Sequence, residues 1–413
     1  MKVLWIVNTL FPEVAELLQI STPVTGGWLS SCAKVLTTRY PHMELAIAVL
    51  YNGAGIKRIR GKYHYFLIPY RHYDRYDTSV EKAFKKISQD FRPDIIHIHG
   101  TEYPHSLAAL NGCNHGKIVV SIQGLVSVYS SYYCGGITYP DLRKFRTLRD
   151  IVKHDSLLVQ QQKMALRGDY EIKLLQKARN IIGRTSWDKA HVWAINPAAR
   201  YYACNETLRE SFYIEKWTLS SCQRHSLFLS QGHYPIKGLH KMIEALPMIL
   251  RHYPDTQVYV AGHNPMSASW GKMCGYGKYI AHLIKSNRLE QNIHFVGNLS
   301  ENEMVSRYKQ SHLFICPSAI ENSPNSVGEA QLLGVPCIAS YVGGTPDMIT
   351  HEKSGLLYRF EETAELAAHI CRLFSDDDWC ERLGSGGRKE AIHRHDYRTI
   401  ARQLYDIYKG LSS

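Results

Sequence analysis

Two glutamates eight residues apart are the most informative acidic groups in the sequence. They bound the segment Glu321-Asn-Ser-Pro-Asn-Ser-Val-Gly-Glu329. Ser323 is a good helix N-cap, Pro324 suits a first helical position, and Gly334 suits a helix end. The first acid would then lie before a helix and the second within it, so both can face one ligand, and a carboxylate can accept two hydrogen bonds from a diol. The pattern also fits an ordinary capped helix with exposed acids.

The start of that predicted helix is a candidate anion site. The backbone N–H groups of Asn325 and Ser326 would lie in its first turn, where they can bind a diphosphate. Upstream, Lys237-Gly238 follows a short strand and a turn, and a lysine there can neutralise a leaving phosphate, although most lysines are merely solvated. Downstream, Gly344 lies in a glycine-containing loop that allows a ligand to approach the backbone closely.

The elements that must position these residues alternate in the manner of parallel βαβ units. We expect strands at 3–7, 44–49, 95–99, 118–122 and 180–182, and again at 227–229, 257–261, 293–296, 313–316 and 336–339. At 413 residues the chain is long enough for two domains. In doubly wound domains ligands bind at the carboxyl ends of the strands, which places the candidate residues where chemistry is expected.

The predicted organisation has three parts. Residues 1–215 form an N-terminal Rossmann-like acceptor domain, 216–395 a C-terminal Rossmann-like donor domain, and 396–413 a last helix that crosses back to the first domain. The polar stretch 218–224 is the expected hinge. Apolar residues at positions 400, 404, 407 and 408 predict that the last helix is amphipathic, although this spacing does not prove the crossing.

In this order the elements resemble the retaining glycosyltransferases of family 4, over nearly the whole chain. The resemblance implies the GT-B fold, an α/β architecture of two Rossmann-like, doubly wound parallel-sheet domains that face each other across a cleft. Glu321 to Glu329 matches the family's E-x7-E motif. By this resemblance Glu329 holds the ribose of a nucleotide, Glu321 lies near the donor sugar, and Lys237 binds the diphosphate. Gly26-Gly27 matches the early glycine pair, whose N–H groups approach the same diphosphate.

Other segments match the family with two departures. Cys316-Pro-Ser matches the dipeptide before the motif, and the segment ending at His99 matches a strand that places a histidine at the cleft. Family members usually have an arginine five or six residues before the lysine, where this chain has Gly232 and Gln231. His233 and Arg184 are the candidate substitutes for this arginine. The family also has a histidine where this chain has Gln123, which can hydrogen-bond a sugar but cannot take up a proton at neutral pH.

Candidate acceptor or sugar residues lie in the first half. His99, Glu102 and Gln123 follow predicted strands, and Arg184 and Asp188 flank a tryptophan after another strand. Arg184 and Asp188 fit a substrate role about as well as they fit a simple salt bridge. Glu102 fits a hydrogen bond to a sugar hydroxyl or the cap of the following helix.

The positive charge lies in one half of the chain. Residues 1–200 carry 27 Lys and Arg against 15 Asp and Glu, which equals the net charge of +12 for the whole chain. This asymmetry favours an anionic partner such as a membrane surface or a phosphate-bearing acceptor. No nucleic-acid-binding motif accompanies it, so nucleic acid is not expected. The segment 139–154 has a basic, amphipathic helical spacing that suits a membrane surface, although an ordinary surface helix fits the same pattern.

No cofactor or metal is expected. The sequence has no DxD motif at a strand end, and its 21 histidines and ten cysteines show no metal-ligand spacing. No apolar run reaches the roughly 18–20 residues that span a bilayer. The opening residues fit a buried strand better than a signal peptide. We therefore expect a cytoplasmic protein with reduced thiols, with a peripheral position on the inner face of the membrane as an extension of this expectation.

The sequence thus predicts transfer of a sugar from a nucleoside diphosphate sugar to a hydroxyl of a glycan or lipid-linked glycan, as in surface polysaccharide or lipopolysaccharide biosynthesis. Retention at the anomeric carbon is implied by the family resemblance alone. A sugar-nucleotide epimerase of GT-B architecture and a non-catalytic sugar-nucleotide-binding homologue are the alternatives. The nucleobase, sugar, acceptor, linkage and oligomeric state do not follow from the sequence, nor does the way the chain compensates for the absent arginine and histidine.

Overall fold

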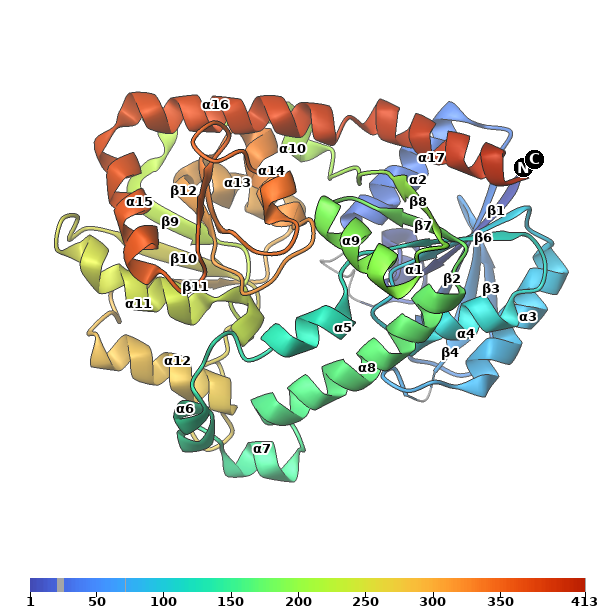
Figure 1. Ribbon diagram of the computed structural model, residues 1–413, viewed down its shortest axis with the longest axis horizontal. Coiled ribbons are helices and arrows are strands. Elements are labelled where there is room, and N and C mark those ends of the chain that lie inside the picture. Colours follow the sequence, from blue (N-terminus) through green and yellow to red (C-terminus); the bar gives the residue numbers. More distant parts are fainter. Residues whose placement is uncertain (21–25, 71, 413) are drawn as a thin grey trace. The chain divides into compact units, whose positions relative to one another are not determined.

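The computed structural model describes residues 1–20, 26–70 and 72–412, and Figure 1 shows its helices and strands. The chain forms two compact units. Unit 1 comprises Met1–Ser130, Lys163–Leu208 and His395–Ser413, and unit 2 comprises Ser131–Gln162 and Arg209–Arg394. Each has a sheet covered by helices, and both sheets are predominantly parallel, as the alternation of strands and helices predicted.

Unit 1 is built on an eight-stranded sheet in the order β3-β4-β2-β1-β5-β6-β7-β8. All neighbours in it are parallel except the β3–β4 pair. Its strands are β1 (Lys2–Val7), β2 (Glu44–Tyr51), β3 (Lys57–Arg60), β4 (His64–Pro69), β5 (Ile95–His99), β6 (Lys117–Ser121), β7 (Asn180–Gly183) and β8 (Arg200–Ala203). The carboxyl ends of β1, β5, β6 and β7 therefore meet at one edge of the sheet.

Helices cover this sheet and build two apolar clusters from its alternate side chains. The helices of unit 1 are α1 (Pro12–Leu17), α2 (Gly27–Arg39), α3 (Thr78–Phe91), α4 (Pro104–Gly112), α5 (Val126–Tyr129), α9 (Ser186–Ile195), α17 (Tyr397–Ser412) and most of α8 (Leu157–Lys177). Both α8 and the 3₁₀ turn Ser130–Tyr132 contain residues of both units. In α3, Asp77 caps the first turn by accepting from Ser79 N–H, and apolar residues at 80, 84, 87 and 91 face the core.

The last helix is part of unit 1. Tyr408 on α17 accepts a hydrogen bond from Trp5 Nε1 at 2.9 Å and pairs with His97 Nδ1 at 2.6 Å. Both contacts are buried. The chain therefore packs its C-terminal helix against β1 and β5, far away in sequence.

Unit 2 contains a six-stranded parallel sheet in the order β11-β10-β9-β12-β13-β14. Its strands are β9 (Gln223–Leu229), β10 (Gln257–Ala261), β11 (Ile293–Gly297), β12 (Ser311–Cys316), β13 (Cys337–Ser340) and β14 (Leu356–Tyr358). Its helices are α6 (Tyr139–Lys144), α7 (Leu148–Val152), α10 (Ser211–Ile214), α11 (Leu239–Leu250), α12 (Gly275–Ser286), α13 (Glu301–Gln310), α14 (Asn325–Leu333), α15 (Thr363–Ser375) and α16 (Asp377–Arg394), with 3₁₀ turns at Leu219–Ser221, Pro235–Lys237 and Thr345–Asp347.

The division of the chain differs from the predicted ranges 1–215, 216–395 and 396–413. Ser131–Gln162 belongs to unit 2, although the chain on both sides of it is in unit 1. The change of unit comes after Leu208 and not in the polar stretch 218–224, which instead holds a 3₁₀ turn and the start of β9. Composition alone does not show where a segment packs, and this explains both differences.

All ten predicted strands are present, with ends shifted by a few residues. The sequence interpretation missed β3, β4, β8 and β14, which are edge strands or lie next to one; β3 and β8 carry weak apolar patterns, whereas β4 and the three-residue β14 are apolar and buried. The single helix expected at 139–154 is two short helices, α6 and α7. Among the residues that the structure describes, we find no helix long and apolar enough to cross a bilayer.

Candidate functional site

Three loops meet at the carboxyl edge of the unit 2 sheet. The first leads from β9 through a 3₁₀ turn ending at Lys237 into α11. Gly238 has a left-handed backbone with φ of 69°, and a Cβ there would lie 1.6 Å from the carbonyl oxygen of Pro317. Ala319 N–H donates to the carbonyl of Ile236 at 2.7 Å. Glycine is thus required for the lysine loop to pack against the loop that follows β12.

Lys237 is the centre of an ion-paired group. Its Nζ lies 2.6 Å from Glu321 Oε1, and Ser318 Oγ donates to the same oxygen at 2.7 Å. Burial alone would lower the pKa of Lys237, but the carboxylate of Glu321 more than offsets burial and the pKa is raised. The lysine therefore stays a cation at physiological pH, as a residue that binds a diphosphate must.

The third loop follows β13 and carries Gly344, a predicted donor-binding residue. Gly344 N–H donates to the carbonyl of Glu321 at 3.0 Å. The preceding Gly343 has φ of 51°, and a Cβ there would lie 1.9 Å from the same carbonyl oxygen. Gly343 and Gly344 thus fix the backbone of Glu321. This role is more specific than the one predicted from the sequence, which was only to let a ligand approach the loop backbone closely.

The helix that follows Glu321 begins one residue later than predicted. Pro324 is the N-cap residue of α14 and Asn325 is its first residue, whereas we expected Ser323 to be the cap. Pro324 is extended (φ −67°, ψ 116°), and the carbonyl of this residue accepts the first helical hydrogen bonds. Asn325 and Ser326, both partly exposed, therefore place their N–H groups in the first turn, where the helix itself supplies no acceptors.

Glu329 lies inside α14 with a partner that the sequence did not reveal. Arg209 Nε and Nη2 lie 3.0 and 2.7 Å from Glu329 Oε1. Burial raises the pKa of Glu329, and the guanidinium opposes this shift. The arginine is 120 positions away and belongs to no local motif, so sequence spacing could not have identified it.

His233 does not replace the missing family arginine as a cation. Its pKa is lowered to about 4 by burial and by the nearby charges of Lys237 and His263. It is therefore neutral at pH 7. The other substitute, Arg184, belongs to unit 1.

In unit 1, the predicted glycine pair stands at the start of a long helix. Gly26 is the N-cap of α2 with φ of 84°, and Gly27 is its first residue. A Cβ at Gly26 would lie 2.3 Å from the Thr9 side chain. The pair thus presents first-turn N–H groups after the β1 loop, as an anion-binding glycine pair requires.

His99 at the end of β5 is buried and neutral. Neither ring nitrogen has a hydrogen-bond partner in the structure, and the ring packs against Trp5, Trp28 and His97. Burial and the neighbouring His97 hold its pKa well below the usual range. A buried imidazole with unsatisfied nitrogens is suited to bind a neutral hydroxyl.

Glu102 and Gln123 lie together around Gly100. A Cβ at Gly100 would lie 2.4 Å from Glu102 Oε2 and 3.4 Å from Gln123 Cγ. Burial raises the pKa of Glu102 to about 7. Behind it lies Glu171, a buried acid that sequence reasoning missed. It accepts from Ser127 N and Oγ, and burial raises its pKa to about 7.

Arg184 and Asp188 have structural partners. Arg184 Nη1 lies 2.7 Å from Glu206 Oε2 and Nη2 donates to the carbonyl of Gln123. Asp188 is fully buried and accepts from Arg184 N–H at 2.9 Å and Tyr201 Oη at 2.5 Å. The structure therefore places Asp188 inside the fold, while Arg184 adjoins Gln123. No group of three or more described His, Cys, Asp or Glu residues has metal-binding geometry.

The sequence of unit 2 has recognised relatives. Residues 215–390 match the family described as Glycosyl transferases group 1. Spore coat protein SA of Bacillus subtilis is 28% identical over 177 residues, which is 42% of this chain and 46% of that protein. D-inositol 3-phosphate glycosyltransferase of Corynebacterium urealyticum is 27% identical over 176 residues, covering 43% and 41%. The matched region thus spans less than half of the length of these curated relatives.

Solved structures resemble the entire chain. Sucrose-phosphate synthase from Thermosynechococcus elongatus has a TM-score of 0.73 at 16% identity, covering 100% of this chain and 99% of that one. Anabaena HepE, solved in complex with UDP-glucose, has a TM-score of 0.68 at 16% identity and covers 100% of both chains. The predicted GT-B fold is confirmed.

Proposed function

We propose that the protein is a retaining hexosyltransferase that uses a nucleoside diphosphate sugar and belongs with the family 4 enzymes. The observation that carries the proposal is the Lys237–Glu321 ion pair at the strand edge that also holds the first turn of α14. The match of residues 215–390 to glycosyltransferases supports it. A cation beside the first-turn N–H groups of a helix is suited to a diphosphate, and Glu321 keeps that cation charged.

In the proposed reaction the bond between the anomeric carbon and the diphosphate breaks, and a bond to an acceptor hydroxyl oxygen forms on the same face. The hydroxyl proton passes to the departing diphosphate, whose growing charge Lys237 and the N–H groups of Asn325 and Ser326 stabilise. Glu329 accepts hydrogen bonds from the ribose hydroxyls, and Glu321 lies near the sugar. The same proposal assigns no metal or other cofactor to this reaction.

Unit 1 supplies the neutral hydrogen-bonding groups in this proposal. Gly26 and Gly27 offer further N–H groups to the diphosphate, and His99, Glu102 and Gln123 bind sugar or acceptor hydroxyls. Arg184 positions Gln123 through its carbonyl. We propose as acceptor a glycan or lipid-linked glycan of surface polysaccharide or lipopolysaccharide type, and a protein that works in the cytoplasm at an anionic membrane surface.

A thermal-shift screen with UDP, GDP, ADP and their sugar conjugates tests the donor site. A ligand that binds only the folded state raises its stability by RT ln(1 + [L]/Kd). We expect one nucleotide to stabilise the wild type, and Glu329→Ala to weaken its binding about tenfold or more through the lost hydrogen bonds.

Glu381→Ala removes an exposed glutamate of unit 2 and is the matched control, expected to retain the full shift. If no nucleotide shifts the folded wild type, or if Glu329→Ala binds as well as Glu381→Ala, the donor-site proposal is wrong. A donor-only incubation that yields an isomerised sugar nucleotide would instead indicate an epimerase.

A further inference from the structure

The segment Ser131–Gln162 has an inverted distribution of polar and apolar side chains. On α7, Asp150 is buried with 2% of its surface exposed, whereas Leu148 and Val152 are 81% and 79% exposed. Ile151 is also exposed, so the aliphatic residues occupy positions i, i+3 and i+4 on one face. Tyr139 on α6 is a further exposed aromatic residue. Soluble proteins bury such side chains and expose acids, so this reversal needs a partner.

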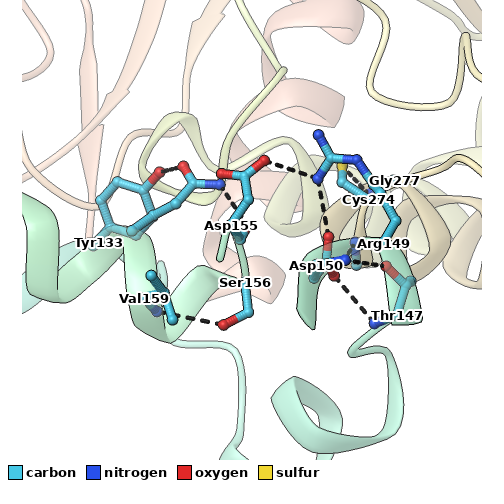
Figure 2. Close-up of polar contacts among 11 residues, drawn as sticks. Tyr133, Thr147, Arg149, Asp150, Asp155, Ser156, Val159, Cys274 and Gly277 are labelled. Atoms are coloured by element: carbon cyan, nitrogen blue, oxygen red, sulfur yellow. Dashed lines mark hydrogen bonds and ion pairs between the residues drawn. The ribbon is translucent and has the colours of Figure 1, made fainter. Parts of the chain in front are cut away.

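The buried acid explains why the aliphatic face cannot turn inward. Asp150 Oδ2 accepts from Gly275 N–H, the first residue of α12, at 2.9 Å, and it forms a capping box with Thr147. Arg149 Nη1 lies 3.1 Å from Asp150 Oδ1 and 2.8 Å from Asp155 Oδ2. Figure 2 shows the contacts of Arg149 with Asp150 and Asp155 and of Asp150 with Thr147, beside Cys274 and Gly277 at the start of α12.

Two further contacts hold the same segment to unit 2. Phe145 packs against Tyr279 and His282 of α12 with ring centroids 5.3 and 5.1 Å apart. His240 Nε2 pairs with the carbonyl of Gly135 at 2.7 Å. The orientation of α7 is therefore set by fixed contacts on its inner side, and its outer side is presented as a rigid surface.

The charge of that surface identifies its partner. Arg143, Lys144, Arg146 and Lys153 are exposed on and around α6 and α7. The segment 131–162 has five Lys and Arg against three Asp, a net charge of +2, and Asp150 and Asp155 both lie within ion-pairing distance of Arg149. The facing helix α12 contributes Lys278 and Lys285 and no acid. Exposed aliphatic residues accompanied by exposed cations on the same helices and the loop between them are complementary to the acyl boundary and headgroups of an anionic lipid surface.

We propose that α6 and α7 form a docking surface for an anionic membrane, on which unit 2 rests through Leu148, Ile151 and Val152. This rests on the proposed function in one respect, since a lipid-linked acceptor would require the enzyme at a bilayer. Each basic side chain near such a surface strengthens partitioning by about fivefold, and the three aliphatic side chains add hydrophobic insertion.

Flotation of the full chain with vesicles tests the surface. We expect the wild type to bind phosphatidylcholine–phosphatidylglycerol vesicles mixed at about two to one, and to bind pure phosphatidylcholine only weakly. Leu148→Glu/Val152→Glu should weaken binding at least about 30-fold. Leu166→Glu alters another exposed leucine (62%), on α8 in unit 1, and should bind as the wild type does.

Arg146→Gln/Lys153→Gln should weaken binding to the mixed vesicles by about 20-fold and reduce its salt dependence. The proposal is wrong if the folded wild type ignores anionic vesicles at low salt, or if the double glutamate variant binds like Leu166→Glu. It is also wrong if the wild type is a dimer that Leu148→Glu/Val152→Glu dissociates, because a second copy would then cover this face. The assay contains no nucleotide, and the nucleotide thermal shift contains no lipid, so either proposal can fail alone.

Discussion

The carboxyl edges of the two sheets differ in the polar groups of their candidate substrate residues. In unit 2, Lys237 and Glu321 are an ion pair, and Arg209 and Glu329 are another. In unit 1, His99 is held neutral by burial and burial raises the pKa of Glu102 to about 7, while the Arg184–Glu206 ion pair lies at the same edge. Both edges belong to parallel sheets followed by glycine-bearing loops, so the fold does not explain the difference.

The difference is instructive about what each edge can bind. Buried charges are stable only with partners, and the partners in unit 2 keep a cation ready for an anionic ligand. Buried neutral groups with unsatisfied nitrogens or oxygens favour hydroxyl groups, which neither bring nor need charge. In the proposed function, the cation of unit 2 binds the diphosphate, to which Gly26 and Gly27 of unit 1 add N–H groups, and His99 and its neighbours in unit 1 bind hydroxyl groups.

The largest expected effect comes from removing the cation of unit 2. Lys237→Ala should lower kcat by about 10²–10³-fold, because the charge of the departing diphosphate loses its principal stabilising group. The measurement is the rate of nucleoside diphosphate release from the donor identified in the nucleotide screen. Lys353→Ala removes an exposed lysine of the same unit and should leave the rate unchanged.

Because Lys237→Ala leaves Glu321 buried without its cation, Lys237→Ala/Glu321→Gln provides a second variant that is easier to fold. A near-wild-type kcat in either folded variant would contradict the assignment of Lys237.

The glycines before the two helices offer a structural test of the same comparison. Gly238→Ala places a Cβ against the rigid backbone of Pro317, so we expect a loss of about 3 kcal/mol in unfolding free energy. The described atoms nearest to a Cβ in Gly26→Ala belong to the Thr9 side chain and not to the backbone, so a smaller loss of about 1–2 kcal/mol is expected. Gly262 also has a left-handed backbone, with φ of 86°, but a Cβ there would have no described neighbour closer than 4.0 Å. Gly262→Ala therefore measures the cost of the left-handed conformation alone. Urea unfolding should rank the variants in that order, and equal losses would contradict the role of packing.

The fold was more predictable from the sequence than the site. Apolar strand segments and the glycines that follow them can be recognised locally in the sequence. All ten strands predicted in this way are present. The acids, lysine and glycines of the donor motif were identified in the same way. Arg209, Glu171 and Glu206 were not, because each acts on a residue far away in sequence. The packing of Ser131–Gln162 depends on Asp150 meeting Gly275, a contact across 125 positions that no local pattern encodes.

A smaller effect is expected at His99. His99→Gln should lower turnover by about 10–100-fold and leave the nucleotide thermal shift intact, since a neutral hydrogen-bonding group contributes less than a charged one. His115→Gln changes an exposed histidine of the same unit and serves as the control. If His99→Gln also abolishes the nucleotide shift, the separation of roles between the two edges is wrong.

The smallest expected effect is the pH dependence contributed by Glu102. Its folded pKa of about 7 lies above the ordinary value of 4.5. Between these values the folded state binds more protons than the unfolded state, so this group makes stability fall as pH rises. Glu102→Gln removes the titration. The unfolding free energy of the variant minus that of the wild type should therefore rise by about 1–2 kcal/mol between pH 5 and pH 8. This rise is smaller than the pKa shift alone would give, because Glu102 is partly exposed.

Urea unfolding at the two pH values measures this difference, and taking the variant relative to the wild type cancels the opposing contributions of the buried histidines. Glu16→Gln, at an exposed position of unit 1, should show no such change. A pH-independent difference for Glu102→Gln would mean that the acid is ionised in the folded protein. Glu102 would then be a charged candidate residue of unit 1, and the contrast with the ion-paired candidate residues of unit 2 would rest on His99 alone.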